Sequence, residues 1–423
     1  MSMAQSEFST KLDLAWVRSQ FPALAQTVND QPAVFLDGPG GTQVSERVIQ
    51  AISDYLRQSN ANTHGAYRTS RQTDAMLEEA RTAMADFLGC DADEIVFGAN
   101  MTSLTYAISR AVGRELGPGN EIVVTHLDHD ANVSPWRQLE ETGATVCFAD
   151  IRAEDCTLDM NDLARKLSGH TRLVAVGYAS NAVGTINPVK EVVRLAHAAG
   201  ALAYIDAVHY APHGPIDVEA LDSDFLVCST YKFFGPHMGV LYGKREHLKR
   251  LKAYRLRANS DESPWRWEWG TLNHECIAGI AACVAYLSEL GLRVDSAAAT
   301  RRKAVLAAFA AIQAYERDLG GRLVRGLLEI RGLKFYGIRE LGRFGERCPT
   351  VAVRIAGRSP LELATRLGDR GFFTWDGNYF ALNLSERLDV EKDGGFLRIG
   401  LVHYNTAEEV DRLLGALREF ASA

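Results

Sequence analysis

The chain has 423 residues, of which 47% are apolar and 23% charged, and its formal net charge is −7. This length allows a large core and a second, smaller domain, and without a basic run we expect no binding to nucleic acid. Residues 1–11 are polar and lack a signal-peptide core, and no apolar run approaches a membrane span, so we expect a cytoplasmic protein without a membrane anchor.

Seven cysteines are scattered along the chain, and none of them belongs to a CxxC pair. Because their number is odd and their spacing irregular, we expect neither a disulfide framework nor a metal site. A reducing cytoplasm fits this pattern. The cysteines are Cys90, Cys147, Cys156, Cys228, Cys276, Cys283 and Cys348.

Short apolar runs alternate with helical patterns through most of the chain. The alternation predicts an α/β fold with a mainly parallel sheet and helices on both faces. An apolar helix at 277–290 is expected to join a large domain, residues 33–290, to a smaller α+β domain formed by residues 1–32 and 291–423. The strand-like runs lie at 33–37, 94–99, 122–125, 145–148, 173–176, 202–206, 225–228 and 239–242.

The first candidate binding element follows the apolar run 94–99, where Thr102 and Ser103 lead into a helix expected from Leu104. Free backbone N–H groups and the helix dipole favour a phosphate at such a place. An ordinary helix N-cap explains the same residues, and both interpretations can hold at once.

Two residues further along the chain point to covalent cofactor chemistry. Asp206 ends the apolar run 202–205, and ligands in open α/β sheets bind at such strand ends. Lys232 lies between the runs 225–228 and 239–242, and burying a lysine is costly unless it is paired, neutral or covalently used. A pyridoxal phosphate site uses a lysine for a Schiff base and an aspartate for the ring nitrogen. Each residue alone also fits a simpler interpretation, a surface lysine and a helix-capping aspartate.

Asp206 and the motif Ser229-x-x-Lys232, whose lysine comes 26 residues later, resemble the motifs of the class V aminotransferase family. The resemblance runs from about Phe35 to the C-terminus and is strongest to the branch of cysteine desulfurases and selenocysteine lyases. It implies the aspartate-aminotransferase-like fold and pyridoxal 5'-phosphate as the cofactor.

The resemblance implies a role for each matching residue. Lys232 is expected to carry the cofactor and to take the α-proton, Asp206 to hold the pyridine nitrogen, and His129 to stack on the ring. Ser103, His209 and Tyr231 depart from the family pattern, which has an acidic residue, a glutamine and a histidine at these positions. The further cofactor-binding residues are expected to be Thr102, Ser103, Asn181, His209, Ser229, Tyr231 and Thr271.

The resemblance also implies a homodimer with shared active sites. Gly270-Thr271-x-Asn273 matches a motif whose threonine reaches the phosphate in the partner subunit. The loop 60–68 resembles one that contacts the substrate, often across the interface, although an exposed polar loop explains it equally well. Its candidate substrate contacts are His64 and Arg68, and the alternating Trp265, Trp267 and Trp269 are typical of a packing stripe in an interface or a core.

Two positions near the C-terminus bear on the reaction. Arg398 matches the arginine that pairs with the substrate α-carboxylate, for which a guanidinium fork is well suited. With Asn181 and His64 it forms the expected substrate-binding set. Phe380 stands where desulfurases carry the cysteine that accepts sulfur, and phenylalanine cannot act as a nucleophile. We expect Phe380 to be buried and to shape the pocket together with Trp375, Asn378 and Tyr379.

The expected activity is therefore C–S lyase chemistry, a β-elimination from a cysteine-like amino acid without a sulfur-accepting cysteine. Transamination and epimerisation on the same scaffold remain alternatives. The products distinguish them: pyruvate and ammonia, a keto acid, or inverted configuration. A non-catalytic protein of this fold is disfavoured because Lys232, Asp206, His129 and Arg398 are all present.

Overall fold

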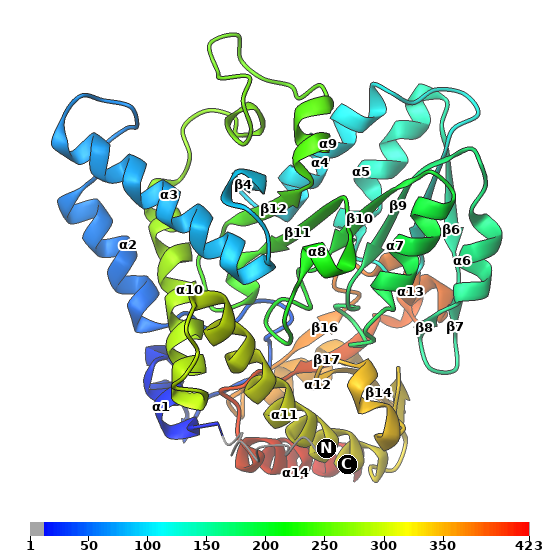
Figure 1. The fold of residues 1–423 in the computed structure, drawn as a ribbon. Coiled ribbons are helices and arrows are strands. Elements are labelled where there is room, and N and C mark those ends of the chain that lie inside the picture. Colours follow the sequence, from blue (N-terminus) through cyan, green and yellow to red (C-terminus); the bar gives the residue numbers. More distant parts are fainter. Residues whose placement is uncertain (1–11, 423) are drawn as a thin grey trace, which may run out of the picture.

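The structure is a computed structural model, and it describes residues 12–422 (Figure 1). A seven-stranded sheet and a four-stranded sheet organise the chain. Residues 1–11, which we expected in the smaller domain, lie outside the described residues. Short elements connect the larger ones: α1 (Leu14–Ser19), β1 (Thr27–Val28), β2 (Gln31–Pro32), β7 (Ile151–Arg152), β8 (Thr157–Leu158) and α13 (Leu382–Arg387).

The seven-stranded sheet is mainly parallel, as the sequence predicts. Only β12 runs against its two neighbours in this sheet, β11 and β4. In order across the sheet the strands are β4 (Ile95–Gly98), β12 (Gly239–Gly243), β11 (Phe225–Ser229), β10 (Leu202–Asp206), β9 (Thr171–Gly177), β5 (Glu121–Thr125) and β6 (Thr145–Ala149).

Helices cover both faces of this sheet (Figure 1), which is why its central strands β10 and β11 are apolar up to their carboxyl ends, where Asp206 and Ser229 stand. In β10, Ala203 and Ile205 pack in the core on one face, while Tyr204 packs in the core on the other. The first face carries α2 (Glu46–Gln58), α3 (Arg68–Leu88), α6 (Met160–Lys166), α7 (Val189–Ala198), α8 (Val218–Leu221) and α10 (His274–Val294). The second carries α4 (Met101–Gly113), α5 (Ser134–Arg137) and α9 (Arg245–Arg250).

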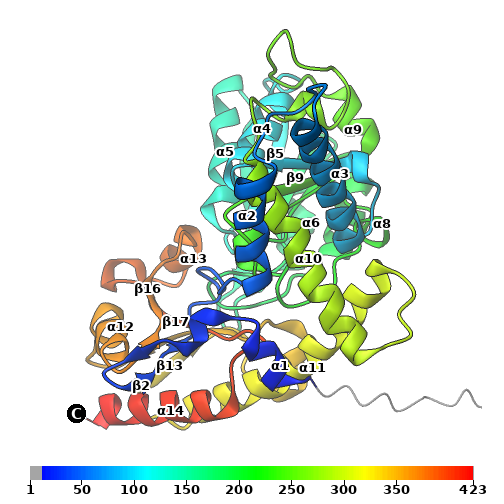
Figure 2. The ribbon, with the colours of Figure 1, turned by 90° about the vertical axis from the view of Figure 1, so that its left-hand side faces the viewer.

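The four-stranded sheet is antiparallel, and helices cover its outer side (Figure 2). A short strand from the start of the chain, β3 (Val34–Phe35), pairs with β15 (Phe372–Phe373), so Val34 and Leu36 pack in the core of this sheet. The predicted domain boundaries at residues 33 and 290 stay predictions. The strands are β13 (Leu333–Tyr336), β14 (Thr350–Ile355), β17 (Phe396–Gly400) and β16 (Trp375–Gly377), and the helices α12 (Pro360–Gly368) and α14 (Ala407–Ser422).

Two long helices link the sheets. By length and composition α10 could cross a membrane, which corrects our expectation that no apolar stretch approaches that length. It packs against α2, α3 and α11, and 56% of its most apolar stretch is buried, as in a core helix. The next helix, α11 (Arg301–Leu328), runs from the core of the larger sheet at Phe309 into the core of the smaller sheet at Leu323.

A glycine-rich turn, residues 38–41, lies between the two sheets. The N–H of Gly400 in β17 donates to the carbonyl of Leu36 at 2.8 Å, just before the turn. A Cβ on Gly400 would lie 2.0 Å from Cδ of Pro39, so a glycine is required for this approach. On the other side the N–H of Thr42 donates to the carbonyl of Tyr231 at 3.0 Å. The turn is thereby held beside the segment that carries Lys232.

Candidate active site

A cavity of about 600 Å³ opens where the carboxyl ends of β9, β10 and β11 face the smaller sheet. Such strand ends are the usual ligand sites of open α/β sheets. The predicted site residues that line it are Thr102, His129, Asn181, Asp206, His209, Ser229, Tyr231, Lys232 and Arg398, together with Trp375, Asn378, Tyr379 and Phe380.

Lys232 lies in a single helical turn after β11, and its Nζ is directed at the glycine-rich turn. Nζ donates to the carbonyls of Pro39 and, at 2.9 Å, of Gly40. Shielding from water, and to a smaller degree the positive charge of Arg398, lower the pKa of Lys232 to about 7, while the charge of Asp206 opposes the shift. The amine is therefore neutral in about half of the molecules at pH 7, and a neutral amine is what nucleophilic use of a lysine requires.

Asp206 ends β10 and is buried at the floor of the cavity. Its Oδ1 accepts from the N–H of Val208 at 2.8 Å. Burial raises its pKa to about 6, and this hydrogen bond and the charge of Lys232 act in the opposite direction. At neutral pH the side chain is mostly a carboxylate, so it can hold a cationic ring nitrogen.

His129 follows β5 and lines the same cavity. Its Nδ1 accepts from the N–H of Ala131 at 3.0 Å, so the neutral ring carries its proton on Nε2. Burial lowers the pKa of His129 to about 4, with Lys232 and Arg398 acting in the same direction. The ring is uncharged at neutral pH, which suits stacking on a heteroaromatic cofactor.

The N-terminus of α4 closes one end of the cavity, where Asn100, Met101 and Thr102 line it. The N–H of Met101 donates to Oγ of Ser229 at 3.1 Å, and that of Ser103 to Oδ1 of Asn100 at 2.8 Å. Within residues 12–422 the N–H of Thr102 has no hydrogen-bond partner, which leaves it for an anion at the positive end of the helix. Ser103 instead forms a capping box with Asn100, so its hydroxyl lies away from the cavity.

Arg398 and Asn181 face the cavity from opposite sheets. The guanidinium of Arg398, in β17, donates to the carbonyl of Asn181 at 2.9 Å and lies 4.0 Å from the ring centre of Tyr379. Burial lowers the pKa of Arg398 to about 10, so it stays a cation at neutral pH. Asn181 donates to the carbonyl of Tyr379 at 2.9 Å, while its Oδ1 is buried without a partner among the described residues. Both side chains therefore retain capacity for a ligand.

The prediction that Phe380 is buried is wrong, because 69% of its surface is exposed in the single chain. Tyr379 and Phe380 have φ values of 58° and 61°, in the left-handed region that side-chain-bearing residues seldom adopt. The N–H of Asp130 holds this bend by donating to the carbonyl of Phe380 at 2.7 Å. The Phe380 ring consequently stacks on His129, with centroids 5.3 Å apart, at the rim of the cavity.

Besides Ser103, three predicted contacts lie away from this cavity. His64, 76% exposed by its side chain, sits on the α2–α3 loop with Nδ1 3.5 Å from Asp74, and Arg68 begins α3. Thr271 is exposed just before α10. The tryptophan stripe splits: Trp267 is 3% exposed and donates to the carbonyl of Leu248, whereas Trp265 and Trp269 are 44% and 43% exposed.

Sequence reasoning missed several acidic residues in or beside the site, among them Asp37, Asp128 and Glu391. Burial raises the pKa of Asp128 to about 7 and that of Asp37 to about 6. Asp128 lines the cavity and accepts from Nδ2 of Asn132 at 3.0 Å, and Glu391 accepts from Nδ2 of Asn378 at 2.9 Å. Asp37 ends an apolar run just as Asp206 does, which is the signal that could have identified it.

The residues present fit pyridoxal phosphate. The cavity offers an amine with a lowered pKa at Lys232, a buried carboxylate at Asp206 and the N-terminus of α4 for the phosphate. The unpartnered Oδ1 of Asn181, within the part of the chain that the structure describes, adds an acceptor for a hydroxyl of the cofactor or an ammonium of the substrate.

Comparison with known proteins finds matches along most of the chain. A family model described as aminotransferase class-V matches residues 34–413. A probable cysteine desulfurase of Halalkalibacterium halodurans is 32% identical over 95% of this chain and 97% of its own length. An aminotransferase-like protein, FGM3, of Gibberella zeae is 32% identical over 98% of this chain and 99% of its own.

Solved structures show the same fold. An apo cysteine desulfurase from Thermococcus onnurineus NA1 has a TM-score of 0.84 at 27% identity, covering 99% of this chain and 100% of that one. The cysteine desulfurase CsdA of Escherichia coli has a TM-score of 0.82 at 26% identity, covering 96% and 98%. The predicted fold and family are thus confirmed. The match over residues 34–413 and the relatives above 30% identity show that the chain belongs to the class-V aminotransferase family of pyridoxal-phosphate-dependent enzymes.

Proposed function

We propose that this enzyme cleaves a carbon–sulfur bond in a cysteine-like amino acid by β-elimination. When bound, pyridoxal phosphate supplies an electron sink for the charge left at the α-carbon. The residues of the chain then have to attach the cofactor, bind the amino acid and move one proton.

Lys232 is the residue that moves the proton. Its pKa of about 7 lets Nζ act as a general base at neutral pH and return the proton afterwards. The carboxylate of Asp206 would hold the ring nitrogen in its cationic form, and the uncharged His129, with its N–H on Nε2, would supply a flat ring for stacking. These assignments are supported by the cavity in which all three side chains meet.

Arg398 binds the α-carboxylate of the amino acid. It is buried, it remains cationic, and within residues 12–422 its Nε has no hydrogen-bond partner. A carboxylate can accept from this unused donor, and its charge compensates the buried cation. Asn181, whose backbone carbonyl accepts from Arg398, has an unpartnered Oδ1 among the described residues that can accept from the ammonium of the same amino acid.

The observation that carries the proposed reaction is the combination of an amino-acid site with Phe380 at its rim. The relatives from Halalkalibacterium halodurans and Pectobacterium atrosepticum are named as cysteine desulfurases, which supports a sulfur-containing amino acid as substrate. Phenylalanine cannot accept sulfur, so sulfur has to leave as part of a free product.

The active unit is proposed to be a homodimer of the cytoplasm. Thr271 and His64 are exposed in the single chain and lie away from its own cavity, which agrees with contributions to a partner's site. The exposed Trp265 and Trp269 beside Thr271 supply apolar surface for such an interface.

The test is to incubate the purified holoenzyme with a panel of cysteine derivatives and other amino acids and to identify the products by mass spectrometry. Pyruvate and ammonia with a free sulfur-containing product are expected, and Lys232→Ala and Arg398→Ala should abolish them. A keto acid of unchanged carbon skeleton would instead establish transamination, and an inverted amino acid epimerisation. A persulfide trapped on one of the chain's own cysteines during turnover of free cysteine would contradict the proposed role of Phe380.

A matched pair of variants tests the position itself. Phe380→Cys places a thiol at the cavity rim, whereas Phe380→Leu removes only the ring. Borohydride reduction should fix the cofactor to Lys232 in both, which shows that the site is intact. Trapped persulfide is expected at position 380 in Phe380→Cys alone.

A further inference from the structure

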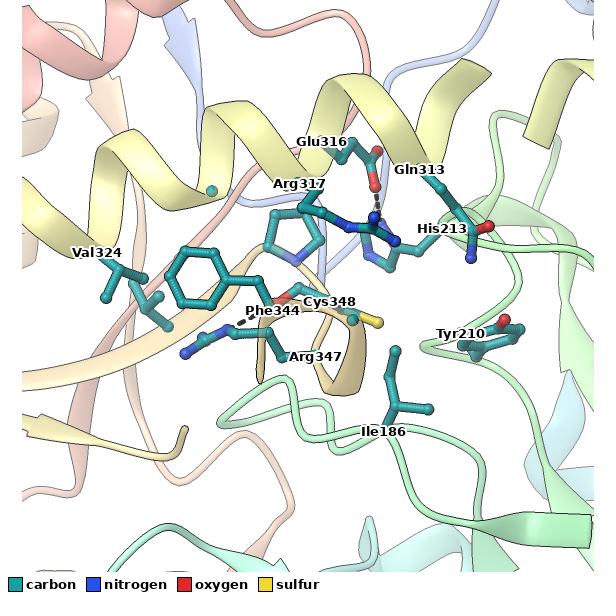
Figure 3. Close-up of a pocket in the computed structure, with 14 residues that line it drawn as sticks. Ile186, Tyr210, His213, Gln313, Glu316, Arg317, Val324, Phe344, Arg347 and Cys348 are labelled. Atoms are coloured by element: carbon teal, nitrogen blue, oxygen red, sulfur yellow. Dashed lines mark hydrogen bonds and ion pairs between the residues drawn. The ribbon is translucent and has the colours of Figure 1, made fainter. Parts of the chain in front are cut away.

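Behind the active-site cavity lies a second, much smaller one, of about 40 Å³, between α11 and the segment that leads into β14 (Figure 3). A cavity needs roughly 10–15 Å³ of such space to hold one water, so this one has room for a small ion with a water. Tyr210, His213, Glu316 and Cys348 line it. None of these residues has a part in the proposed reaction.

Three buried side chains with metal-ligating atoms meet in the wall between the two cavities. One ligand atom from each of His209, His213 and Cys348 lies within 4.8 Å of the others. His209 lines the active-site cavity, and His213 and Cys348 line the small one. The two histidine rings are 5.2 Å apart between centroids.

A carboxylate fixes the orientation of His213. Its Nδ1 lies 2.8 Å from Oε2 of Glu316 on α11, and the side chains are 4% and 3% exposed (Figure 3). This bond leaves Nε2 as the nitrogen available to a ligand. A histidine whose second nitrogen is hydrogen-bonded to a carboxylate is the usual arrangement behind a metal-ligating imidazole.

His209 supplies an independent sign of a missing ligand. Its Nε2 is buried and has no hydrogen-bond partner among residues 12–422. Leaving such a nitrogen without a partner in the interior is unfavourable by roughly 1–3 kcal/mol. A metal ion between His209 and His213 satisfies it.

We propose that His209, His213 and Cys348 bind one divalent metal ion, for which zinc fits best. Two imidazoles and a thiolate are typical zinc ligands, and the small cavity leaves room for a water as the fourth. Zinc holds such ligand atoms roughly 3.3–3.6 Å apart, so they need to approach by about 1 Å.

The charges balance. Binding releases the thiol proton of Cys348 to solvent, and the thiolate together with the carboxylate of Glu316 compensates the two positive charges of the ion. Arg347, the neighbouring cation, donates to the carbonyl of Thr350 at 2.6 Å. Its side chain and that of Cys348 extend in opposite directions in Figure 3.

The ion also acts on the active site. With the metal on Nε2 of His209, the ring proton stays on Nδ1, so this residue keeps a fixed tautomer in the wall of the active-site cavity. The sequence did not predict this site, since the spacing of the cysteines is irregular. The proposed ligands come from two distant segments of the chain, so no local motif marks them.

The test is the metal content of the untagged, reduced holoenzyme after growth with added zinc, measured by inductively coupled plasma mass spectrometry. About one zinc per chain is expected. His213→Gln and Cys348→Ser should each retain less than about a tenth of it, whereas Cys283→Ser, a buried cysteine outside the cluster, should keep it all. Far-UV circular dichroism confirms folding of each variant.

Cobalt gives a second measurement that does not depend on any variant. Cobalt chloride added to the metal-free protein should produce a thiolate-to-cobalt charge-transfer band, which Cys348→Ser lacks and Cys283→Ser keeps. No zinc and no such band in the wild-type protein, or unchanged metal content in Cys348→Ser, would overturn the proposal. The result is independent of the proposed lyase activity, since neither measurement involves turnover.

Discussion

Burial makes Lys232 a base that works near neutral pH. Its amine has a pKa of about 7 in place of 10.5, so the neutral fraction of the amine rises with pH and levels off roughly one pH unit above 7. The rate at which pyridoxal phosphate attaches to the apoprotein should therefore increase about tenfold per pH unit below 7 and level off above it. Stopped-flow absorbance across this range measures the midpoint.

The neighbours of Lys232 should move that midpoint in opposite directions. Arg398 lowers the lysine pKa and Asp206 raises it. Arg398→Gln is thus expected to shift the midpoint to higher pH, and Asp206→Asn to lower pH. A midpoint near 10 in the wild-type protein, or shifts of the same sign in both variants, would contradict this account.

The sequence predicts the residues at strand ends better than those on loops. Asp206 and Lys232 could be placed because each adjoins an apolar strand whose position fixes where the next side chain lies. The exposure of Phe380 could not be predicted from the sequence. It depends on two residues with positive φ and on a hydrogen bond from Asp130, 250 positions away in the chain. A local pattern carries no information about such a contact.

The close approach of β12 to the N-terminus of α4 shapes the phosphate end of the cavity. A Cβ on Gly239 would lie 2.4 Å from the backbone carbon of Asn100, and backbone cannot move aside as a side chain can. We expect Gly239→Ala to destabilise the protein by roughly 1–3 kcal/mol and to weaken cofactor binding at least tenfold. Chemical denaturation and equilibrium dialysis measure the two effects.

Gly117 provides the control, because a Cβ there would meet no atom within 4 Å. Gly117→Ala should leave both stability and cofactor binding nearly unchanged. If the two substitutions changed stability and cofactor binding equally, the close approach of Gly239 to Asn100 would not be the reason for the effect of Gly239→Ala.

Most elements follow from the apolar pattern, and those that differ have a physical reason. The strands of the larger sheet appear where apolar runs occur, since both of its faces are covered. The helix expected from Leu104 begins at Met101, because Asn100 caps it from within the turn. The three tryptophans do not lie on one face, because a short 3₁₀ turn (Trp265–Trp267) directs Trp267 into the core.

The apolar surface at Trp265 and Trp269 is where two chains are proposed to meet. This segment is anchored on its own chain by Glu268, which is buried and paired with Arg81 at 2.6 Å. A charge at the exposed position 269 should therefore disturb association without unfolding the chain. Trp269→Glu is expected to convert a dimer to a monomer and to lower cofactor occupancy, because Thr271 then reaches no partner.

Light scattering with simultaneous absorbance at the cofactor band measures both properties. Leu361→Glu is the matched control, since it places the same charge on an exposed apolar position, 62% accessible, of α12. A wild-type monomer with full cofactor occupancy would exclude the shared site.

The helix α11 has 28 residues and spans about 42 Å, and its two halves belong to different cores. Because both cores pack on this helix, we expect them to unfold together. They could unfold separately only if the helix broke near Gly320 and Gly321, close to the boundary between the two cores. Thermal denaturation should therefore be cooperative. Calorimetry should show one transition, with a measured enthalpy equal to the van 't Hoff enthalpy. Two separate heat-absorption peaks would mean instead that the two glycines divide the protein into independent foldons.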